Sequence, residues 1–293
     1  MGTIKIEIII GKTAGFCYGV KRAIDGSVKE IENNKKQEVC CLGELVHNKQ
    51  VISDLEEKGI KFIERIEDVK NENSKVIIRA HGIEKNIYEK AAKNRIDIVD
   101  YTCPNVLKIH KMAEDYQRKG YYIFLIGVKK HPEIIGTISY CGENFSLITS
   151  EEDIEKSIES FENSNTKKLL VISQTTYSIK KFKNIKKIID EKISKEIELI
   201  IKNTICLATE KRQNETKELS SKVDIMIIIG GKNSSNTKKL YEIALEKCKN
   251  AICIETKDEL EKVEFTNIRK IGIMAGASTP QKSIDEVIEY LNR

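Results

Sequence analysis

The 293-residue sequence lacks the features that mark several classes of protein. No apolar run approaches the roughly 18 residues that a membrane helix requires, and no long apolar segment follows a basic start. We therefore expect a cytoplasmic protein with no membrane partner. The net charge is only +5, and no basic tail or aromatic-rich basic stripe is present, which argues against nucleic acid as a partner.

Compact metal-binding motifs are also missing. The eight cysteines contain no Cys-x-x-Cys pair, and the four histidines form no His-Glu-x-x-His motif. In a cytoplasmic chain, this many cysteines argues against a disulfide framework and leaves inert thiols, metal ligands or redox sites.

One pattern repeats along the chain: a short apolar run, a polar loop, then a helix-like stretch. An example is Tyr121–Ile126, the loop Lys129–Glu133, and Ile134–Tyr140. Such alternation predicts an α/β fold of parallel sheets covered by helices. Because no Pro- or Gly-rich linker interrupts it, we expect three similar small modules packed around a shared centre. Their predicted ranges are 18–101, 102–203, and 1–17 with 204–293, where the first strand, Ile4–Ile10, completes the last module.

Three cysteines, Cys17, Cys103 and Cys206, stand where a predicted strand gives way to a helix. A helix N-terminus lowers a thiol pKa and favours the thiolate. Three converging thiolates suit an iron–sulfur cluster, whereas a structural zinc site needs a fourth ligand. Three ligands leave one iron of a four-iron cluster open to a substrate oxygen, which favours catalysis over electron relay.

The remaining cysteines are expected to be inert, because they fall inside predicted strands or helices. Those in strand-like runs are Cys40, Cys41 and Cys253, and those in predicted helices are Cys141 and Cys248.

Polar side chains gather in the loops that follow predicted strands. His47, His81 and His131 occupy three such loops, and Glu133 stands beside the last. Loops at the carboxyl ends of parallel strands form ligand sites, so these residues predict a polar pocket. Zinc binding by the three histidines is the alternative. His110 lies within a predicted helix and is expected to serve packing or the surface.

Two further loops, Gly230–Asn236 and Ala275–Thr279, place glycine and small hydrogen-bonding side chains ahead of a helix. Backbone N–H groups in such loops suit a phosphate. Ordinary turn and capping chemistry is the alternative. The hydroxyls of Ser173–Thr176 follow another strand and are placed to orient a substrate alcohol or a proton donor.

Together these motifs resemble the LytB/IspH family, the 4-hydroxy-3-methylbut-2-enyl diphosphate reductases. The motifs that carry the resemblance are Gly15–Val20, Val46–Asn48, Ala80–Gly82, Thr102–Pro104, His131–Glu133, Gln174–Thr176, Cys206, Lys232–Asn236 and Ala275–Ser278. The resemblance runs from about residue 4 to residue 290. Tyr101 and Lys130 depart from the residues usual in the family, and neither change removes a functional group.

The resemblance implies a trefoil-like fold around one [4Fe–4S] cluster per chain, bound by Cys17, Cys103 and Cys206, with one iron open. Glu133 matches the family's proton donor, with Thr175 and His131 beside it. The residues implied to bind the diphosphate substrate are His47, His81, His131, Thr175, Ser234, Ser235, Asn236 and Ser278.

The activity implied is reductive removal of the substrate hydroxyl as water. The products would be isopentenyl and dimethylallyl diphosphate, formed in the last step of the non-mevalonate pathway. A donor such as ferredoxin or flavodoxin would supply the electrons. Two other classes stay open: a zinc-dependent hydrolase that uses the three loop histidines and Glu133, and a non-enzymatic iron–sulfur sensor that binds a regulator or nucleic acid.

Overall fold

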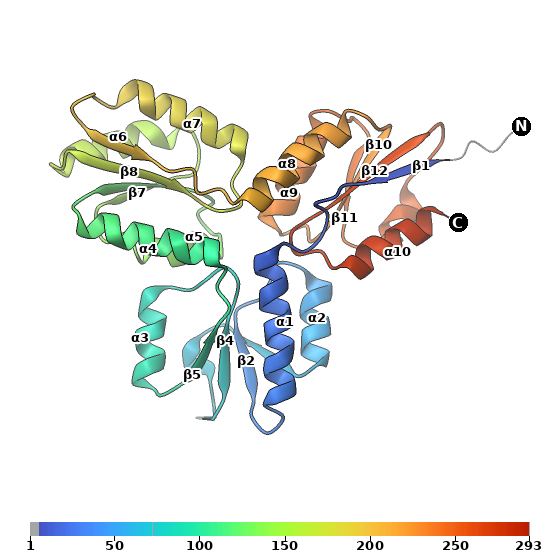
Figure 1. The fold of residues 1–293 in the computed structure, drawn as a ribbon, viewed down its shortest axis with the longest axis horizontal. Coiled ribbons are helices and arrows are strands. Elements are labelled where there is room, and N and C mark those ends of the chain that lie inside the picture. The colour runs from blue at the N-terminus through green and yellow to red at the C-terminus, as the bar shows by residue number, and fades with distance from the viewer. Residues whose placement is uncertain (1–5, 72, 293) are drawn as a thin grey trace, which may run out of the picture. The chain divides into compact units, whose positions relative to one another are not determined.

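Parallel strands alternate with helices along the described chain (Figure 1). This computed structural model describes residues 6–71 and 73–292, so Ile4 of the first predicted strand lies outside the described residues. Within those ranges the strands form three sheets of four strands each, and every pairing is parallel. The predicted α/β class with three parallel sheets is confirmed.

The chain divides into two compact units. Unit 1 contains the chain up to Lys21, Val46–Leu55, and the chain from Leu207 onward. Unit 2 contains Arg22–Leu45 and Glu56–Cys206. Unit 1 holds one sheet and unit 2 holds two, and the exact module boundaries stay a prediction. Within the described ranges, no helix combines the length and the apolar character that crossing a bilayer requires.

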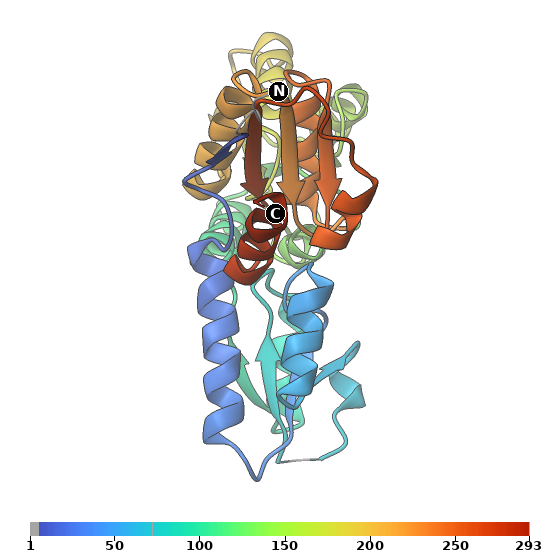
Figure 2. The same ribbon diagram turned by 90° about the vertical axis from the view of Figure 1, so that its right-hand side faces the viewer.

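Unit 1 is built on a sheet with the strand order β1–β12–β10–β11, and Figure 2 shows β12, β10 and β11 side by side. Its elements are β1 (Glu7–Ile10), α8 (Leu207–Ser220), β10 (Ile225–Ile229), α9 (Ser235–Leu245), β11 (Ala251–Ile254), the 3₁₀ helix η2 (Lys257–Lys262), β12 (Lys270–Ala275) and α10 (Gln281–Leu291). Side chains of β10 alternate between two cores. Ile227 packs in the core that includes Val287 of α10, and Ile228 packs in the core that includes Leu240 of α9. Because helices cover both faces, the whole of β10 is buried and apolar.

The first sheet of unit 2 has the order β3–β2–β4–β5. Its elements are β2 (Val39–Leu42), β3 (Ile60–Ile63), the 3₁₀ helix η1 (Ile66–Asp68), β4 (Lys75–Ile78), α3 (Lys85–Lys93) and β5 (Asp97–Asp100). Two helices, α1 (Tyr18–Asn33) and α2 (Lys49–Glu57), begin in unit 1 and end in unit 2. Val76 and Ile78 of β4 pack in one core with Ala91 of α3.

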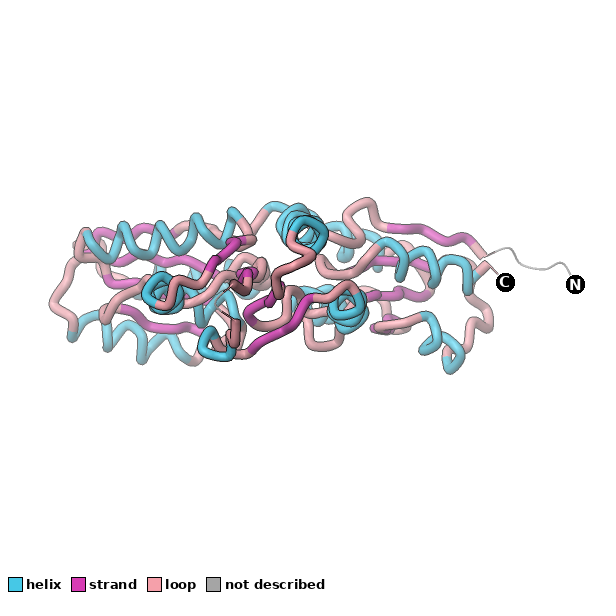
Figure 3. Tube along the Cα trace, turned by 90° about the horizontal axis from the view of Figure 1, so that it is seen from below, coloured by secondary structure: helices cyan, strands magenta, loops and turns pink. Residues whose placement is uncertain are grey.

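The second sheet of unit 2 has the order β7–β6–β8–β9. Its elements are α4 (Pro104–Arg118), β6 (Tyr122–Ile126), α5 (Pro132–Ile138), β7 (Phe145–Ile148), α6 (Asp153–Asn163), β8 (Lys168–Ser173), α7 (Ile179–Lys192) and β9 (Glu198–Ile201). Phe124 of β6 packs edge-on against Phe161 of α6, whereas its neighbour Leu125 shares the opposite core with Ile134 of α5. Helices therefore lie on both faces of the strands (Figure 3).

All three sheets share one strand order. In unit 2 each sheet runs second, first, third, fourth in chain order, as in β3–β2–β4–β5. The sheet of unit 1, written β11–β10–β12–β1, has the same order, with β1 in the place of the fourth strand. The chain leaves the neighbouring first and third strands in opposite directions. The carboxyl ends of these two strands therefore flank the crevice where ligands bind in open α/β sheets.

Tyr101, one of the departures from the usual family sequence, is accommodated by a glycine. A Cβ atom on Gly26 of α1 would lie 2.2 Å from Cε1 of the Tyr101 ring. The Tyr101 hydroxyl donates to Oε1 of Glu30 at 3.1 Å, and the Arg22 guanidinium lies 5.4 Å from the ring centroid. Lys130, the other departure, is exposed.

Some predicted element limits were wrong. Cys248 lies beyond α9, which ends at Leu245, and Cys141 lies beyond α5, which ends at Ile138. The strands β3 and β7 were not predicted. Each is a four-residue edge strand that contains a polar residue. Strands this short carry too little pattern to be separated from loops.

Two leucines on α9 provide a test of this packing. Leu240 is fully buried, whereas Leu245 is 43% exposed. Leu240→Ala should lower the free energy of unfolding by about 2–5 kcal/mol, because it leaves a cavity between α9 and the sheet. Leu245→Ala should lower it by at most about 1 kcal/mol, because much of that side chain already contacts water. Urea denaturation of both variants measures the difference, and equal losses would contradict the placement of α9.

Candidate active site

The predicted site residues follow the carboxyl ends of strands, at three positions that recur in each sheet. After the first strands come His47, His131 and Ser234, after the third strands His81, Thr175 and Ser278, and after the fourth strands Cys103, Cys206 and Cys17. The first two groups follow the neighbouring first and third strands, whose carboxyl ends are where open α/β sheets bind ligands.

In unit 2, Thr175 forms two hydrogen bonds to the carboxyl group of Glu133, one to each oxygen. The Thr175 backbone N–H donates to Oε1 of Glu133 at 2.6 Å, and the Thr175 hydroxyl bonds Oε2 at 2.6 Å. Glu133 is only 2% exposed and Thr175 only 6%. Both carboxyl oxygens are thus fixed in position and screened from bulk water.

Burial dominates the protonation of Glu133. It raises the pKa of the carboxyl to about 7, although the two hydrogen bonds from Thr175 act to lower this pKa. The free-energy cost of removing the carboxylate charge from water exceeds the gain from the two hydrogen bonds. The neutral acid therefore persists to a pH well above the usual pKa of a carboxyl group. The group is therefore poised to release a proton near neutral pH.

His131 caps the helix that carries Glu133. Its Nδ1 accepts a hydrogen bond from the Glu133 backbone N–H at 3.2 Å, at the start of α5. Since Nδ1 acts as an acceptor, a neutral His131 ring carries its proton on Nε2. The His81 ring meets the His131 ring edge-on, with 5.4 Å between centroids. Unit 2 thus brings His81, His131, Glu133 and Thr175 into one cluster.

The two cysteines of unit 2 are tied to this cluster through the backbone. The Cys206 N–H donates to the Thr175 carbonyl at 3.0 Å, and the Cys103 N–H donates to the Ala80 carbonyl at 2.9 Å. Thr175 therefore bonds Glu133 with its amide and hydroxyl while its carbonyl holds the Cys206 loop. Ala80 directly precedes His81, so each cysteine loop is anchored to a loop that bears a predicted site residue.

His110 supports the His81 turn from behind. It is buried, stacks on Tyr140 with 4.3 Å between ring centroids, and has a pKa lowered to about 4 by burial. A Cβ atom on Gly82 would lie 2.8 Å from Cε1 of His110. His110 was expected to serve packing or the surface, and its burial is consistent with packing.

In unit 1, His47, the Gly231 loop and Ser278 lie together. The Ser278 hydroxyl donates to the His47 carbonyl at 3.3 Å. A Cβ atom on Gly231 would lie 2.5 Å from the same carbonyl oxygen, so only glycine allows this approach. The Cys17 N–H donates to the carbonyl of Ala277, the residue before Ser278, at 3.2 Å.

Asn236 carries the clearest sign of a ligand in unit 1. It is 4% exposed, yet neither its side-chain nitrogen nor its oxygen has a hydrogen-bond partner among the described residues. Buried polar atoms normally have hydrogen-bond partners, so this amide is a candidate for contact with a ligand. Ser234 differs, because its hydroxyl caps α9 by accepting from Thr237 N–H at 3.4 Å. Ser235 is the first residue of α9.

The three junction cysteines differ from the others. Cys17, Cys103 and Cys206 are half-buried and stand at the starts of α1, α4 and α8. Burial raises the thiol pKa of four other cysteines, to about 11 for Cys40 and Cys253 and about 12 for Cys41 and Cys141. The structure contains no disulfide among the described residues.

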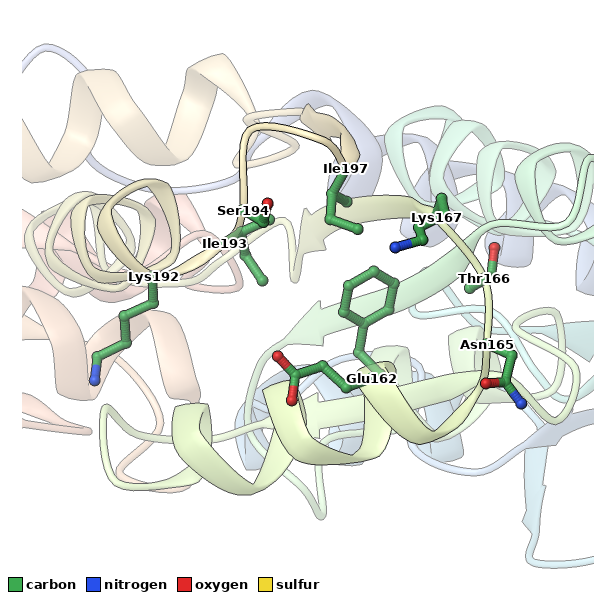
Figure 4. Close-up of a pocket in the computed structure, with 9 residues that line it drawn as sticks. Glu162, Asn165, Thr166, Lys167, Lys192, Ile193, Ser194 and Ile197 are labelled. Carbon is green, nitrogen blue, oxygen red and sulfur yellow. The ribbon is translucent and has the colours of Figure 1, made fainter.

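A separate cavity of about 260 Å³ in unit 2 lies away from this cluster (Figure 4). It opens between the C-terminal ends of α6 and α7, where Glu162, Lys192 and Ser194 line it. Lys167 and Ile197, which precede the starts of β8 and β9, also line it. Thr175 and Cys206 follow the opposite ends of those strands, so the cavity is no part of the candidate site.

Comparison with known proteins agrees with this geometry. A family model described as LytB protein matches residues 8–292. The chain belongs to the LytB family. A 4-hydroxy-3-methylbut-2-enyl diphosphate reductase of Caldanaerobacter subterraneus is 44% identical to this LytB chain over 287 residues, covering 98% of this chain and 96% of the relative. The resemblance predicted from the motifs is confirmed.

Two solved structures are similar to this LytB chain. The reductase of Plasmodium falciparum superposes with a TM-score of 0.90 at 32% identity, covering 99% of this chain and 89% of that one. A second structure is described as the diphosphate reductase that is the terminal enzyme of the non-mevalonate pathway. It superposes with a TM-score of 0.71 at 36% identity, covering 98% and 99%.

Three charged side chains that bind site loops were not predicted from the sequence. Arg212 and Glu215 of α8 and Arg22 of α1 each bond backbone atoms just ahead of a junction cysteine. The available signal was the composition of α8, which buries Arg212, Gln213 and Thr216 where a surface helix normally buries apolar residues.

The raised pKa of Glu133 predicts a pH-dependent stability. Unfolded Glu133 loses its proton near pH 4.5, whereas the folded residue keeps it until about pH 7. Between these values the folded state binds more protons, so the stability that Glu133 contributes falls as the pH rises through this window. The full shift from 4.5 to about 7 is worth roughly 3 kcal/mol.

Glu133→Gln should remove this dependence. The quantity to compare is the free energy of unfolding of Glu133→Gln minus that of the unsubstituted protein, measured by urea denaturation at each pH. This difference should rise by roughly 3 kcal/mol between pH 4.5 and pH 7.5. Glu218→Gln, an exposed change on α8, is the control and should show no such trend. A flat difference for Glu133→Gln would mean that the carboxyl titrates in its ordinary range.

Proposed function

We propose that the protein reduces 4-hydroxy-3-methylbut-2-enyl diphosphate to isopentenyl diphosphate and dimethylallyl diphosphate. The observation that carries the proposal is the buried carboxyl of Glu133, held by Thr175, in a chain similar over 98% of its length to a reductase of that name. A neutral acid near pH 7 is what protonation of a leaving hydroxyl requires.

The junction cysteines fit an iron–sulfur cluster. Cys17, Cys103 and Cys206 are half-buried thiols that directly precede helices, and cysteine sulfur is the ligand that binds such clusters. The four cysteines whose thiol pKa is raised by burial are poor candidates. We therefore assign a [4Fe–4S] cluster with one open iron to these three ligands.

When bound, the cluster would pass two electrons, one after the other, from an external donor to the substrate, and it would offer a Lewis-acidic iron to the substrate hydroxyl. The chain's own residues handle the protons. Glu133 gives its proton to the hydroxyl, which leaves as water, and Thr175 holds the carboxyl in line. A second proton completes the product, and the carbon that receives it decides between the two isomers. The 2% exposure of Glu133 keeps bulk water from the acid.

The diphosphate is assigned to the polar residues that follow the first and third strands. They are His47, His81, His131, Thr175, Ser234, Ser235, Asn236 and Ser278. Asn236 contributes the buried amide that has no partner among the described residues, and Nε2–H of His131 is a donor suited to a phosphate oxygen. An electron donor of the ferredoxin or flavodoxin type completes the scheme. The donor and the cytoplasmic location stay predictions from the sequence.

Cluster ligation is tested by cysteine replacement. Cys17→Ser, Cys103→Ser and Cys206→Ser should each lose most of the bound iron and all turnover of the diphosphate after anaerobic reconstitution. Cys253→Ser is the matched control, because Cys253 is also half-buried yet has a pKa raised to about 11. It should retain iron, sulfide and activity.

These measurements also separate the alternative classes. A zinc-dependent hydrolase would contain zinc in place of iron and sulfide, and an iron–sulfur sensor would hold a cluster without reducing the diphosphate. Either result would overturn the proposed function. Loss of the cluster in Cys253→Ser, with retention in Cys17→Ser, would overturn the ligand assignment alone.

Asn236→Ala tests the diphosphate site. The substitution should raise KM for the substrate by about tenfold or more, because a hydrogen bond to a charged group is worth about 1.5–3 kcal/mol. Iron content should be unchanged. Asn214→Ala, an exposed asparagine on α8, is the control and should leave KM as it is. A normal KM in Asn236→Ala would mean that this loop is an ordinary turn.

A further inference from the structure

In unit 1, Arg212 of α8 holds the loop that leads to Cys17. Its Nε donates to the Thr13 carbonyl at 2.9 Å, and its Nη2 donates to the Gly15 carbonyl at 2.8 Å. Arg212 is 3% exposed, so both bonds are shielded from water. One guanidinium thus fixes the carbonyls two and four residues ahead of the cysteine.

Glu215, one helical turn along α8, binds the start of the same loop. Its carboxylate accepts from the Lys12 N–H at 2.6 Å, the Thr13 N–H at 2.8 Å and the Thr13 hydroxyl at 2.5 Å. The cation therefore takes loop carbonyls while the anion takes loop N–H groups. Residues three apart lie on one face of a helix, which lets α8 present both charges to the loop.

In unit 2, Arg22 of α1 makes the corresponding contact ahead of Cys103. Its Nη1 donates to the Thr102 carbonyl at 3.2 Å, and its Nη2 donates to the Asp100 carbonyl at 3.4 Å. These carbonyls lie one and three residues ahead of the cysteine. The Arg22 guanidinium also lies over the Tyr101 ring, which fixes the residue between them.

The two arginines occupy related places in the repeat. Arg22 is five residues after Cys17, and Arg212 is six residues after Cys206. Each arginine stands on the helix that follows one junction cysteine, and it binds the loop that leads to another junction cysteine. Arg22 binds the loop between β5 and Cys103, and Arg212 binds the loop between β1 and Cys17. The same contact in two sheets argues for a shared role rather than two chance surface bonds.

The third loop, ahead of Cys206, is held by different chemistry. The Thr204 hydroxyl donates to the Ser173 carbonyl at 2.5 Å and accepts from the Ser173 N–H at 2.7 Å. The positions of α4 five and six residues after Cys103 are Lys108 and Ile109, so no arginine stands there. This loop is fixed by its own side chain instead.

We propose that Arg212 and Arg22 are positioning residues for Cys17 and Cys103, each holding one ligand loop in its cluster-binding conformation. The assignment of these cysteines as ligands rests on the proposed function. Arginine suits the task because its planar fork bonds two carbonyls at once and stays charged, which lysine does not match. Preformed ligand loops favour binding by lowering the ordering cost that would otherwise oppose it.

The decisive experiment compares two arginine variants of the metal-free protein and measures the effect of each variant on both cysteine loops. Arg212→Met and Arg22→Met are compared by the alkylation rates of Cys17, Cys103 and Cys206 with iodoacetamide, and by amide hydrogen exchange of residues 11–17 and 100–103. Arg212→Met should change the alkylation rate of Cys17 and speed exchange in 11–17 by about tenfold or more, with Cys103 unaffected. Arg22→Met should do the reverse, and Cys206 is the reference in both.

A second pair guards against a misfolded Arg212→Met. Glu215→Gln weakens the same loop contact without removing the buried arginine, and it should speed exchange in residues 11–17. Glu218→Gln, whose carboxylate pairs with Lys222 on the surface of α8, is its control and should not. Equal effects of Arg212→Met and Arg22→Met on all three cysteines, or no effect of Glu215→Gln, would overturn the proposal.

Reconstituted protein then connects positioning to the cluster. Both arginine variants should release iron to a chelator faster than the unsubstituted protein, with KM for the diphosphate unchanged. Normal iron release in both variants would overturn the positioning role even if the loops had loosened. If no variant or parent binds iron, the proposed function fails, while the crossed pattern in metal-free protein still reports on the loop contacts.

Discussion

Each sheet of this protein is constrained by the neighbouring placement of its first and third strands. The crossovers from these strands go to opposite sides, so their carboxyl ends are left without a covering connection. His131 and Thr175 follow two such strands in one sheet, and Ser234 and Ser278 follow two in another. The polar residues of the candidate site are therefore where the topology leaves room for a ligand.

At Glu133 the fold sets burial against hydrogen bonding. Two donors from Thr175 would favour the carboxylate, yet removal from water favours the neutral acid and prevails. The outcome is an acid that is fixed in orientation and still protonated near neutral pH. Neither effect alone gives both properties, since an exposed carboxyl would be ionised and an unbonded buried one would be free to rotate.

Much of this arrangement was predictable from the sequence. The central strands β6 and β10 are continuous apolar runs because helices cover both of their faces, and the polar loops after them mark the site. The edge strand β3 was missed because its four residues include an exposed lysine. Whether Asn236 or Ser234 merely caps a helix depends on which polar atoms find partners in three dimensions, which sequence does not show. The loop contacts of Arg212 were hidden for the same reason, since they join residues 199 and 197 positions apart.

The pairing of β1 with β12 has a consequence for how the chain acquires its structure. Glu7 lies opposite Lys270, which is 270 − 7 = 263 positions away along the chain. Both sheets of unit 2 use only strands that lie close together in sequence, so they can assemble while the ribosome is still extending the chain. The strand β1 is synthesised long before β12, the strand with which it pairs. The loop that bears Cys17 directly follows β1, so it is among the last parts of the protein to take its final form.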